Sequence, residues 1–269
     1  MNKPLISVNL TTYNRAKLLQ RALDSILAQN YPNLEIIIVD DYSGDNTKDV
    51  VKSYMDRDSR VKYLRHEKNM GNAKARNTAL TNSSGHFIAF MDDDDEWIDK
   101  DKISKQVEIL SNSKNIGIVC SNIRYYENEK EYEDSDIGIP KDLKAHILKG
   151  NGIIHNSTVM TRKTLMEKVG GFDEKMLRGV DSEFFRRCIV KYKIKVHFMP
   201  DITTAYRGFG KDRMTALEKR KDIRKALNAN VYITKKYFQY YLIRPLVLTK
   251  RLKKIVLLTI KYLQFYRYG

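Results

Sequence analysis

Short segments rich in apolar residues alternate with segments of helical periodicity along the first 110 residues of the chain. The strand candidates cover residues 5–11, 35–40, 61–64 and 87–91, of which 35–40 and 87–91 are the most continuously apolar, and the helical segments cover residues 16–29, 47–56 and 72–81. Strands and helices that alternate over such short connections predict a parallel sheet with right-handed crossovers. This arrangement is typical of nucleotide-binding folds, although a fold alone does not decide function.

The pattern is looser from residue 99 to about residue 200. We expect strands at 116–121 and 156–160, an acidic surface loop at 127–136, and helices at 99–111, 162–168 and 181–191. This half should complete the sheet and form the acceptor side of a cleft. The predicted fold class is α/β, with a Rossmann-like, mostly parallel central sheet flanked by helices.

The net charge of +16 is concentrated at the C-terminus. Residues 206–269 contain 17 Lys and Arg against 3 Asp and Glu, whereas residues 1–205 contain 32 against 30. We therefore expect a main domain at 1–205, with a nucleotide-binding half at 1–110 and an acceptor-side half at 111–205, and a basic helical C-terminal extension at 206–269. A uniformly basic nucleic-acid binder would not show this division of charge, and a nearly neutral main domain with a cationic extension favours an anionic surface, so we expect no nucleic-acid partner.

The C-terminal extension contains a candidate amphipathic helix over residues 246–268. Helical spacing places an apolar set on one side and three lysines opposite: Leu248, Leu252, Ile255, Thr259 and Leu263 against Lys250, Lys254 and Lys261. Such helices bind anionic membrane surfaces, where each cation contributes on the order of 1 kcal/mol. Packing on the main domain or a homodimer contact is the alternative, but the number of cations favours a membrane.

Cysteine usage and hydropathy indicate the compartment. Cys120 and Cys188 are the only cysteines, and they form no Cys-x-x-Cys pair. The N-terminus lacks the pattern of a signal peptide, and no 18-residue apolar window predicts a membrane-spanning helix. We expect a cytoplasmic protein, peripheral on the inner face of the cell membrane.

Four consecutive aspartates, residues 92–95, follow the apolar run at 87–91. The carboxyl end of a strand in an open α/β sheet faces the crevice where ligands bind. Adjacent carboxylates disfavour one another's ionisation unless a cation neutralises them, and oxygen ligands favour a hard cation that bridges to a diphosphate. A solvated acidic loop is the alternative, because most runs of charge are of that kind.

Polar residues also follow the first two predicted strands, at 11–15 and 40–47. Their side chains can cap the next helix or form ordinary turns. The same loops could hold a nucleoside, with Tyr13 beneath the base and an aspartate bonded to a ring N–H and a ribose hydroxyl. Three polar strand ends on one edge of one sheet favour a binding site over three unrelated caps.

Taken together, these segments resemble the family-2 inverting glycosyltransferases of the GT-A fold, of the type that builds bacterial surface polysaccharides. The resemblance covers residues 4–190 in the family's order. It rests on these segments: ISV at 6–8, TTYNR at 11–15, EIIIVDDYSGDNT at 35–47, NMGNAKARN at 69–77, the strand leading into 92–97, VGGFDE at 169–174 and GVDSEFFRR at 179–187. The C-terminal extension carries no family-wide motif.

The resemblance implies a nucleotide-sugar donor, expected to be a UDP-sugar, bound at the first strand ends. Thr11, Tyr13 and Asp41 would contact the uridine, and Arg76 would lie near the diphosphate.

The same resemblance assigns the aspartate run to the Asp-x-Asp signature. Asp92 and Asp93 would bind the nucleotide, with Asp92 nearer the ribose, and Asp94 would ligate Mn2+ or Mg2+. The four-acid run departs from the family, whose middle position is often small, which leaves the register open by one residue. Asp95 and Glu96 are expected to cap the helix that begins near residue 99.

An inverting transfer also needs a carboxylate that takes the proton of the acceptor hydroxyl. The family often has Glu-Asp where this chain has Val180-Asp181, which leaves Asp181 as the candidate base and Glu183 as the second. The structural alternative for Asp181 is a helix N-cap. Arg186 and Arg187 are expected on the solvated face of the same helix.

Three further residues are candidates for the cleft. His155 could face the acceptor or the metal, although a lone histidine is more often structural. Arg207 and Arg213 lie in a Gly-containing segment that could close over the diphosphate. A processive synthase is disfavoured, because Trp97 is the only tryptophan and no Gln-x-x-Arg-Trp motif exists.

The resemblance thus predicts a metal-dependent, non-processive hexosyltransferase that moves one sugar to a hydroxyl of a glycan or lipid-linked glycan. The alternative is a non-catalytic module whose basic extension binds nucleic acid or a protein partner. A nucleotidyltransferase would also use acids and a divalent ion, but no Gly-rich, Lys-containing phosphate loop follows the first strand.

Overall fold

The computed structural model describes residues 3–127, 130–135, 138–150, 152–207, 217 and 219–267. The strands of this part of the chain are β1 Ile6–Thr12, β2 Leu34–Asp40, β3 Val61–Arg65, β4 Phe87–Asp92, β5 Glu96–Trp97, β6 Ile116–Glu127, β7 Lys130–Asp134, β8 Met160–Arg162 and β9 Lys195–Tyr206. The helices are α1 Ala16–Leu27, α2 Thr47–Met55, α3 Asn72–Thr81, α4 Lys102–Asn112, α5 Leu143–Lys149, α6 Lys163–Val169, α7 Val180–Arg186, α8 Arg220–Lys236, α9 Phe238–Leu242 and α10 Pro245–Arg267. A 3-10 helix at Asn156–Thr158 and a π-helical turn at Arg187–Lys191 complete the elements.

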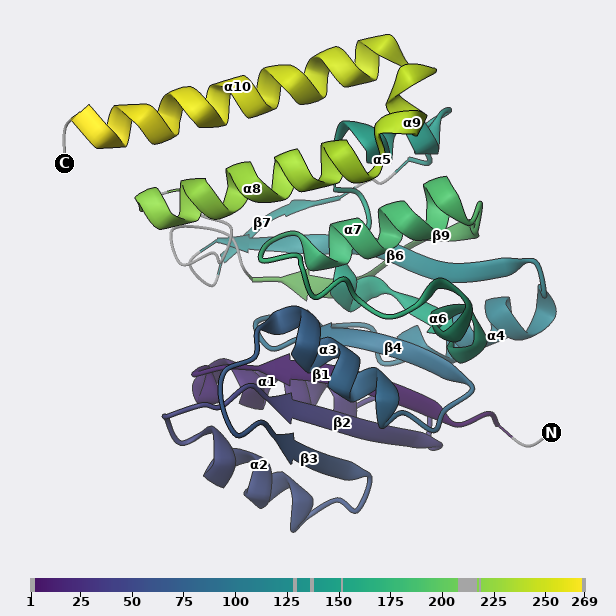
Figure 1. Cartoon of the computed structure of the whole chain (residues 1–269). Coiled ribbons are helices and arrows are strands. Elements are labelled where there is room, and N and C mark those ends of the chain that lie inside the picture. The colour runs from purple at the N-terminus through teal and green to yellow at the C-terminus, as the bar shows by residue number, and fades with distance from the viewer. Residues whose placement is uncertain are drawn as a thin grey trace.

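One mixed sheet organises the fold, with strand order β3-β2-β1-β4-β8-β6-β9-β5 and β7 paired to β6 (Figure 1). Strands β1 to β4 run parallel, β8 is antiparallel between β4 and β6, and β9 runs parallel to β6. Thr11 pairs with Asp92 across β1 and β4, and Thr12 pairs with Asp40 across β1 and β2. The carboxyl ends of these three strands therefore meet at one edge, and the predicted α/β class is confirmed.

The second half of the sheet differs from the sequence prediction. The stretch expected to be a surface loop contains β7, which pairs with β6 through residues that include Arg124 and Asp134, 2.7 Å apart. This charged cross-strand pair leaves no apolar alternation for a sequence pattern to detect. The strand expected at 156–160 is a 3-10 helix followed by the short β8, and β9 has no counterpart in the prediction.

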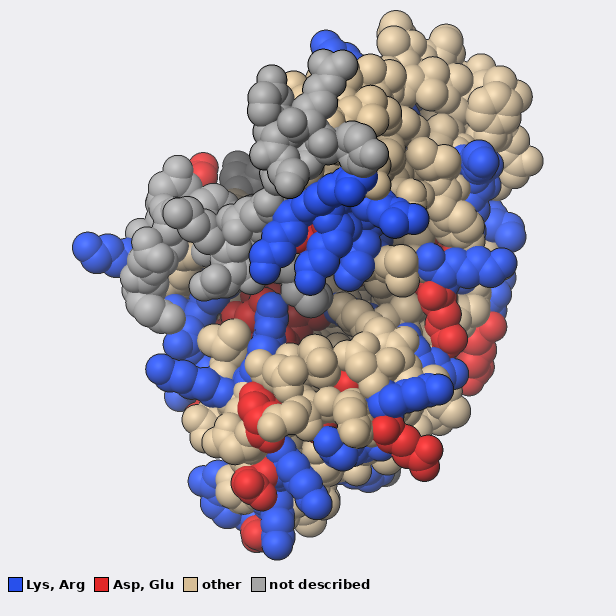
Figure 2. All heavy atoms as spheres, turned by 60° about the vertical axis from the view of Figure 1, so that its left-hand side comes forward, with Lys and Arg blue, Asp and Glu red and all other residues tan. Residues whose placement is uncertain are grey.

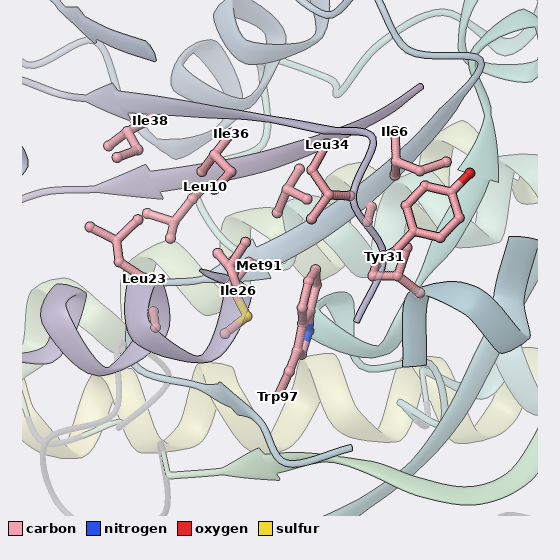
Figure 3. Close-up of a cluster of buried hydrophobic side chains, with 14 of the residues drawn as sticks. Ile6, Leu10, Leu23, Ile26, Tyr31, Leu34, Ile36, Ile38, Met91 and Trp97 are labelled. Atoms are coloured by element: carbon pink, nitrogen blue, oxygen red, sulfur yellow. The ribbon is translucent and has the colours of Figure 1, made fainter. Parts of the chain in front are cut away.

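Side chains of β2 alternate between two cores. Ile36 and Ile38 pack with α1, whereas Ile37 and Val39 pack against α3 on the other face. Figure 3 shows the first of these cores, with side chains of β1 and β2 beside those of α1 and Trp97. Burial on both faces explains why β2 and β4 are nearly continuous apolar runs in the sequence.

The C-terminal extension packs against the main domain. Helices α8 and α10 lie side by side at one end of the molecule, with α10 outermost (Figure 1). Tyr237 and Tyr241, at the junction of α8 and α9, are buried in the same apolar cluster as Phe184 of α7. Strand β9 continues to Tyr206, and the boundary placed between residues 205 and 206 stays a prediction.

No helix in the described part of the chain combines the length and the apolar character that a membrane crossing requires.

A lysine is buried at the start of α4. Lys102 is inaccessible to solvent, its Nζ donates to Oε1 of Gln106 at 2.8 Å, and Nζ lies 4.3 Å from the centre of the Trp97 ring. Burial lowers the pKa of Lys102 to about 7, against the opposing charge of Asp99. Below that pH, the folded protein has to hold a charged ammonium in its core.

We predict that Lys102→Met stabilises the protein more at pH 7 than at pH 9. The folded-state pKa lies below the unfolded one, so the cost of Lys102 is largest below about pH 7 and declines as the pH rises towards 10.5. Urea titrations should show a difference on the order of 2 kcal/mol between the effects at the two pH values. Lys105→Met on the same helix is the control, because hydrogen bonds to Asp201 and Asp99 raise its pKa and its effect should not vary over this range. Equal effects of Lys102→Met at both pH values would contradict the buried charge.

Candidate active site

The four aspartates form the turn after β4, at the edge where β1 and β2 also end. The backbone N–H of Asp95 donates to the carbonyl of Asp92 at 3.2 Å and closes the turn. Asp93 and Asp95 are buried, whereas the side chains of Asp92 and Asp94 are 30% and 28% exposed. Figure 2 shows acidic side chains within a hollow of the molecule, with lysine and arginine side chains directly above them. Burial of two acids distinguishes this turn from a solvated acidic loop.

Two arginines from different elements neutralise the turn. Arg15, at the start of α1, donates from Nη1 to Asp93 at 3.0 Å and to Asp94 at 2.7 Å. Arg76 of α3 donates from Nη2 to Oδ1 of Asp92 at 2.5 Å. Such charge-assisted bonds offset the repulsion among neighbouring carboxylates.

Burial, together with the remaining repulsion between carboxylates, raises the pKa values of three of these acids. Burial raises the pKa of Asp93 to about 7, although Arg15 opposes the shift. Burial and the charge of Asp92 raise the pKa of Asp94, and burial together with Asp94 and Asp92 raises that of Asp95. A further cation at the turn would stabilise the ionised acids, so this turn is suited to a positively charged ligand.

The 3-10 helix before β8 supports the turn through residues that the sequence analysis did not single out. Asn156 donates from Nδ2 to Oδ1 of Asp92 at 2.9 Å. The Ser157 hydroxyl donates to Asp95 at 2.5 Å and accepts the backbone N–H of Asp92 at 3.0 Å. The only signal in the sequence was the polar run Asn-Ser-Thr within a segment predicted to be a strand.

Asp95 and Glu96 do not cap the following helix, contrary to the sequence-based expectation. Helix α4 begins further on, with Asp101 at its cap position. Asp95 is held by Ser157, and Glu96 lies in β5, where it accepts two hydrogen bonds from Arg207 at 3.1 and 2.8 Å. Pairing of β5 with β9 keeps the chain extended here and moves the helix start away from the acids.

The residues expected to contact uridine lie at the ends of β1 and β2. Thr11 is partly buried beside Asp92, and the Tyr13 ring is 46% exposed. Asp41 is buried and accepts hydrogen bonds from the backbone N–H groups of Met70 and Gly71, at 2.8 and 2.7 Å. These bonds attach Asp41 to the loop before α3. The contact of Asp41 with uridine stays a prediction.

His66 belongs to the same arrangement and was not recognised in the sequence. Its Nδ1 lies 2.7 Å from Oδ1 of Asp41, and its Nε2 lies 2.9 Å from the Thr78 hydroxyl of α3. His66 therefore links the end of β2 to α3, the helix that carries Arg76.

Asp181 lies in the first turn of α7 and is half-buried. Burial raises its pKa, while Arg76 lowers it and Asp92 raises it further. These two residues are the ion pair at the end of β4, so the fold brings Asp181 to the acidic turn from the far half of the chain. Gly179, in the left-handed conformation with φ of 66°, occupies the cap position that the structural alternative gave to Asp181.

Glu183, the second candidate base, is fully buried and engaged elsewhere. It accepts a hydrogen bond from the Tyr237 hydroxyl at 2.8 Å and pairs with Lys236 at 2.8 Å and with Arg187 at 3.2 Å. Glu183 therefore links α7 to the C-terminal extension.

Arg186 and Arg187 do not lie on a solvated face, which corrects the sequence-based expectation. Arg186 is 3% exposed and donates to the carbonyl of Ile147 at the end of α5. Arg187 donates to the carbonyls of Val169 and Gly171 at 3.1 and 2.6 Å. Elements distant in the sequence cover this side of the helix, and helical periodicity alone cannot show them.

His155 packs in a cluster of aromatic rings near the acids. Its ring centroid lies 6.2 Å from that of Tyr125 and 5.3 Å from that of Tyr206. Burial lowers the pKa of His155 to about 4, against the opposing effect of Asp92. The imidazole is therefore neutral at pH 7 and can act as a hydrogen-bond donor or acceptor. Arg213 lies outside the described residues.

The carboxylate oxygens of the turn are suited to bind a hard divalent cation. Among the described residues, no three His, Cys, Asp or Glu side chains are grouped so that they could enclose an ion. Magnesium and similar ions are often held by one or two carboxylates together with the phosphates of a substrate. The partly exposed carboxylates of Asp92 and Asp94 are suited to that arrangement.

Comparison with known proteins identifies the family. The model of Glycosyl transferase family 2 matches residues 7–170, more than half of the chain. An uncharacterized glycosyltransferase of Methanocaldococcus jannaschii is 30% identical over 203 residues, which cover 73% of this chain and 69% of that protein. The Escherichia coli UDP-Glc:alpha-D-GlcNAc-diphosphoundecaprenol beta-1,3-glucosyltransferase WfgD is 38% identical over 169 residues, which cover 62% of this chain and 63% of that one.

A solved structure confirms the fold. The mannosyltransferase PcManGT of Pyrobaculum calidifontis, determined in complex with GDP-Man and Mn2+, superposes with a TM-score of 0.66 at 20% identity. The match covers 94% of this chain and 74% of that one, and it confirms the GT-A architecture. On the family match and the fold together, this chain belongs to glycosyltransferase family 2.

Proposed function

We propose that the chain transfers a single hexose from a UDP-sugar to a hydroxyl of a glycan or lipid-linked glycan, with inversion at the anomeric carbon. The name of the E. coli relative specifies UDP-Glc as the donor and a diphosphoundecaprenol-linked acceptor, which supports the donor and the acceptor class proposed here. Family membership favours this activity over a non-catalytic binding module. Surface-polysaccharide synthesis is the process that we infer.

The position of Asp181 carries the proposal. Its carboxylate is half-buried beside the Arg76–Asp92 pair, and burial raises its pKa. A carboxylate with a raised pKa is a stronger base towards a hydroxyl proton than an ordinary surface aspartate. Direct displacement requires a general base close to the diphosphate of the sugar donor. The position of Asp181 in the first turn of α7, next to the candidate diphosphate site, supports that role.

In the proposed reaction, Asp181 accepts the acceptor's hydroxyl proton as that oxygen bonds to the anomeric carbon. The bond from this carbon to the diphosphate oxygen breaks, and its electron pair leaves with UDP. We assign Arg76, which is buried against Asp92, to stabilising the departing diphosphate, and the exposed ring of Tyr13 to stacking beneath the uracil ring. A divalent cation bound at Asp94 would supply further stabilisation of the leaving group.

Asp181→Asn should lower the transfer rate by about 100-fold or more, because the amide cannot accept the proton. UDP affinity should stay unchanged, since we assign Asp181 no donor contact. Rates are measured as UDP release with a panel of UDP-sugars and lipid-linked acceptors, and UDP affinity by calorimetry. Glu167→Gln on α6, which removes an exposed carboxylate, is the matched control. A normal rate for Asp181→Asn would remove Asp181 from the mechanism.

We propose Asp94 as the direct metal ligand, with Asp92 nearer the ribose and Asp93 also contributing to nucleotide binding. The Mn2+ complex of the mannosyltransferase supports a divalent cation in this fold. The exposed part of the Asp94 side chain, beside a buried and partly neutralised Asp93, is where an ion could bridge to phosphate.

Asp94→Ala should weaken UDP binding in Mn2+ by about tenfold or more and leave the weaker binding in EDTA unchanged, because only the metal-dependent part is lost. Calorimetric titration of UDP under both conditions gives the two affinities. Asp58→Ala, at a partly exposed ion pair with Arg60 just before β3, at the opposite end of the parallel strands from the turn, should bind UDP as the unsubstituted protein does. Identical Mn2+ dependence in Asp94→Ala would refute the ligand assignment.

We propose that the extension rests on an anionic membrane surface. Large apolar side chains around the α9–α10 junction are exposed, among them Leu242 at 60%, Ile243 at 78% and Leu246 at 80%. Exposed lysines follow on α10, at positions 250 and 253. Apolar side chains flanked by cations fit the boundary between lipid headgroups and acyl chains.

The double variant Ile243→Ser/Leu246→Ser should lower binding to phosphatidylglycerol vesicles by about tenfold or more, because two exposed apolar anchors are lost. Vesicle co-sedimentation at low and high salt measures the binding. Ile139→Ser is the control, because Ile139 is 61% exposed on a different part of the chain. The unsubstituted protein could instead fail to bind the vesicles and sediment as a dimer that the double variant disrupts. That result would show that the surface is a homodimer contact.

A further inference from the structure

The loop between α6 and α7 packs against α3, the helix that carries Arg76 (Figure 1). The loop contains Phe172, whose ring is buried, and the guanidinium carbon of Arg76 lies 5.4 Å from the centre of that ring. An aromatic face attracts a guanidinium, most strongly where both groups are removed from water. The loop therefore contacts the arginine that we assign to the donor diphosphate.

Arg76 is fixed by three partners and keeps one nitrogen for a ligand. Its Nε donates to Oδ1 of Asn72 at 2.7 Å, its Nη2 donates to Oδ1 of Asp92 at 2.5 Å, and Phe172 lies against its face. Among the described residues, none accepts a hydrogen bond from its Nη1, and this atom still reaches solvent. Nη1 is therefore the atom through which Arg76 can bind an anionic group.

Asn77, which follows Arg76 on α3, fixes the backbone at Phe172. Its Oδ1 accepts the backbone N–H of Phe172 at 2.7 Å, and its Nδ2 donates to the carbonyl of the same residue at 2.9 Å. Gly171 allows this approach, since a Cβ at that position would lie 2.3 Å from Oδ1 of Asn77. One side chain of α3 thus holds the residue whose ring contacts the preceding side chain of the same helix.

The C-terminal extension holds the same loop. Asp173 accepts a hydrogen bond from the Tyr232 hydroxyl at 2.8 Å and forms an ion pair with Lys236, and both partners belong to α8. The backbone on either side of the Phe172 ring is therefore restrained, by α3 at one residue and by α8 at the next.

Core packing is the structural explanation for Phe172, and it accounts for only part of this arrangement. The centroid of the ring lies 5.7 Å from that of Phe90 and 5.0 Å from that of Phe184. Leucine would fill much of the same space, but it offers no aromatic face to a guanidinium. Packing alone also gives no reason for the two hydrogen bonds from the residue next to Arg76.

We propose that Phe172 is a positioning residue, which holds the Arg76 guanidinium in the orientation in which Nη1 binds the donor diphosphate, and that Asn77 holds Phe172 in place. The inference rests on the proposed function, because it requires that Arg76 binds the donor. It makes the loop between α6 and α7 part of the donor site without any contact between Phe172 and the nucleotide.

The test compares UDP with UMP, because only UDP carries the second phosphate. Calorimetric titrations at one Mn2+ concentration give the ratio of the two affinities. Arg76→Gln should lower the preference for UDP by about tenfold or more, since a charge-assisted bond to phosphate is lost. Phe172→Leu keeps an apolar side chain but removes the ring face, and should lower the preference by about threefold to tenfold. A general loss of folding would weaken both nucleotides alike.

A double variant tests whether Phe172 acts through Arg76. In the Arg76→Gln background, Phe172→Leu should cause no further fall in the preference for UDP, because the group that it positions is gone. A further fall would show that Phe172 acts elsewhere. Asn77→Ala leaves the ring intact and should also lower the preference, so the proposal can be tested even if Phe172→Leu folds poorly.

Phe87→Leu is the matched control for Phe172→Leu. Phe87 is also buried, and the guanidinium carbon of Arg162 lies 5.5 Å from its ring centre, at the opposite end of β4 from the acidic turn. This variant removes the same kind of contact and should leave the preference for UDP unchanged. Asn82→Ala is the control for Asn77→Ala, because the Asn82 amide donates to a carbonyl of its own helix.

Three results would overturn the proposal. If Arg76→Gln lowers the preference for UDP while Phe172→Leu and Asn77→Ala leave it unchanged, the donor assignment stands and the positioning role is wrong. If Arg76→Gln itself leaves the preference unchanged, the donor assignment of Arg76 is wrong and the positioning role falls with it. Equal falls in Phe172→Leu and Phe87→Leu would show that lost packing, and not the contact with Arg76, is responsible.

Discussion

Charge compensation at the turn after β4 is the constraint on which the site depends. Four successive carboxylates, two of them buried, cannot all ionise in the folded protein unless positive charge is close. Arg15 at the start of α1 and Arg76 from α3 supply it at distances of 2.5 to 3.0 Å. The parallel register of β1, β2 and β4 brings both arginines to the same edge. The sheet topology therefore also provides the positive charge that the four aspartates require.

The first half of the fold was predictable because three of its strands, β1, β2 and β4, are buried on both faces. Strands β2 and β4 are nearly continuous apolar runs, β1 alternates apolar with small polar residues, and each is followed by turn or cap residues that mark its end. Strand β7 was not predicted because it is held by cross-strand partners of opposite charge. The 3-10 helix at 156–158 was not predicted because its polar side chains form hydrogen bonds to the acidic turn. Partners more than 60 residues away decide the local structure at 156–158, whereas β7 depends on charged partners in the neighbouring strand of the same hairpin.

The site was predictable only to the extent that its residues end strands or open helices. That reasoning named Asp92, Asp94 and Asp181, and the fold brings Asp94 and Asp181 close enough to Asp92 to interact with its charge. It did not identify Asn156 or Ser157, since their partners lie more than 60 residues away in the chain. It also placed Arg186 and Arg187 in solvent, because helical periodicity shows one face but not what covers the other. Residues that hold a site together have weaker sequence signals than residues that face a ligand.

Glu183 connects α7 to the C-terminal extension. It lies two positions from Asp181, and its buried charge is neutralised by Lys236 of α8. Tyr237 completes the arrangement from the same side. Truncation or replacement of the extension would leave this buried carboxylate unpaired unless another segment supplied both partners. The fold around α7, and with it the position of Asp181, is therefore expected to depend on the extension.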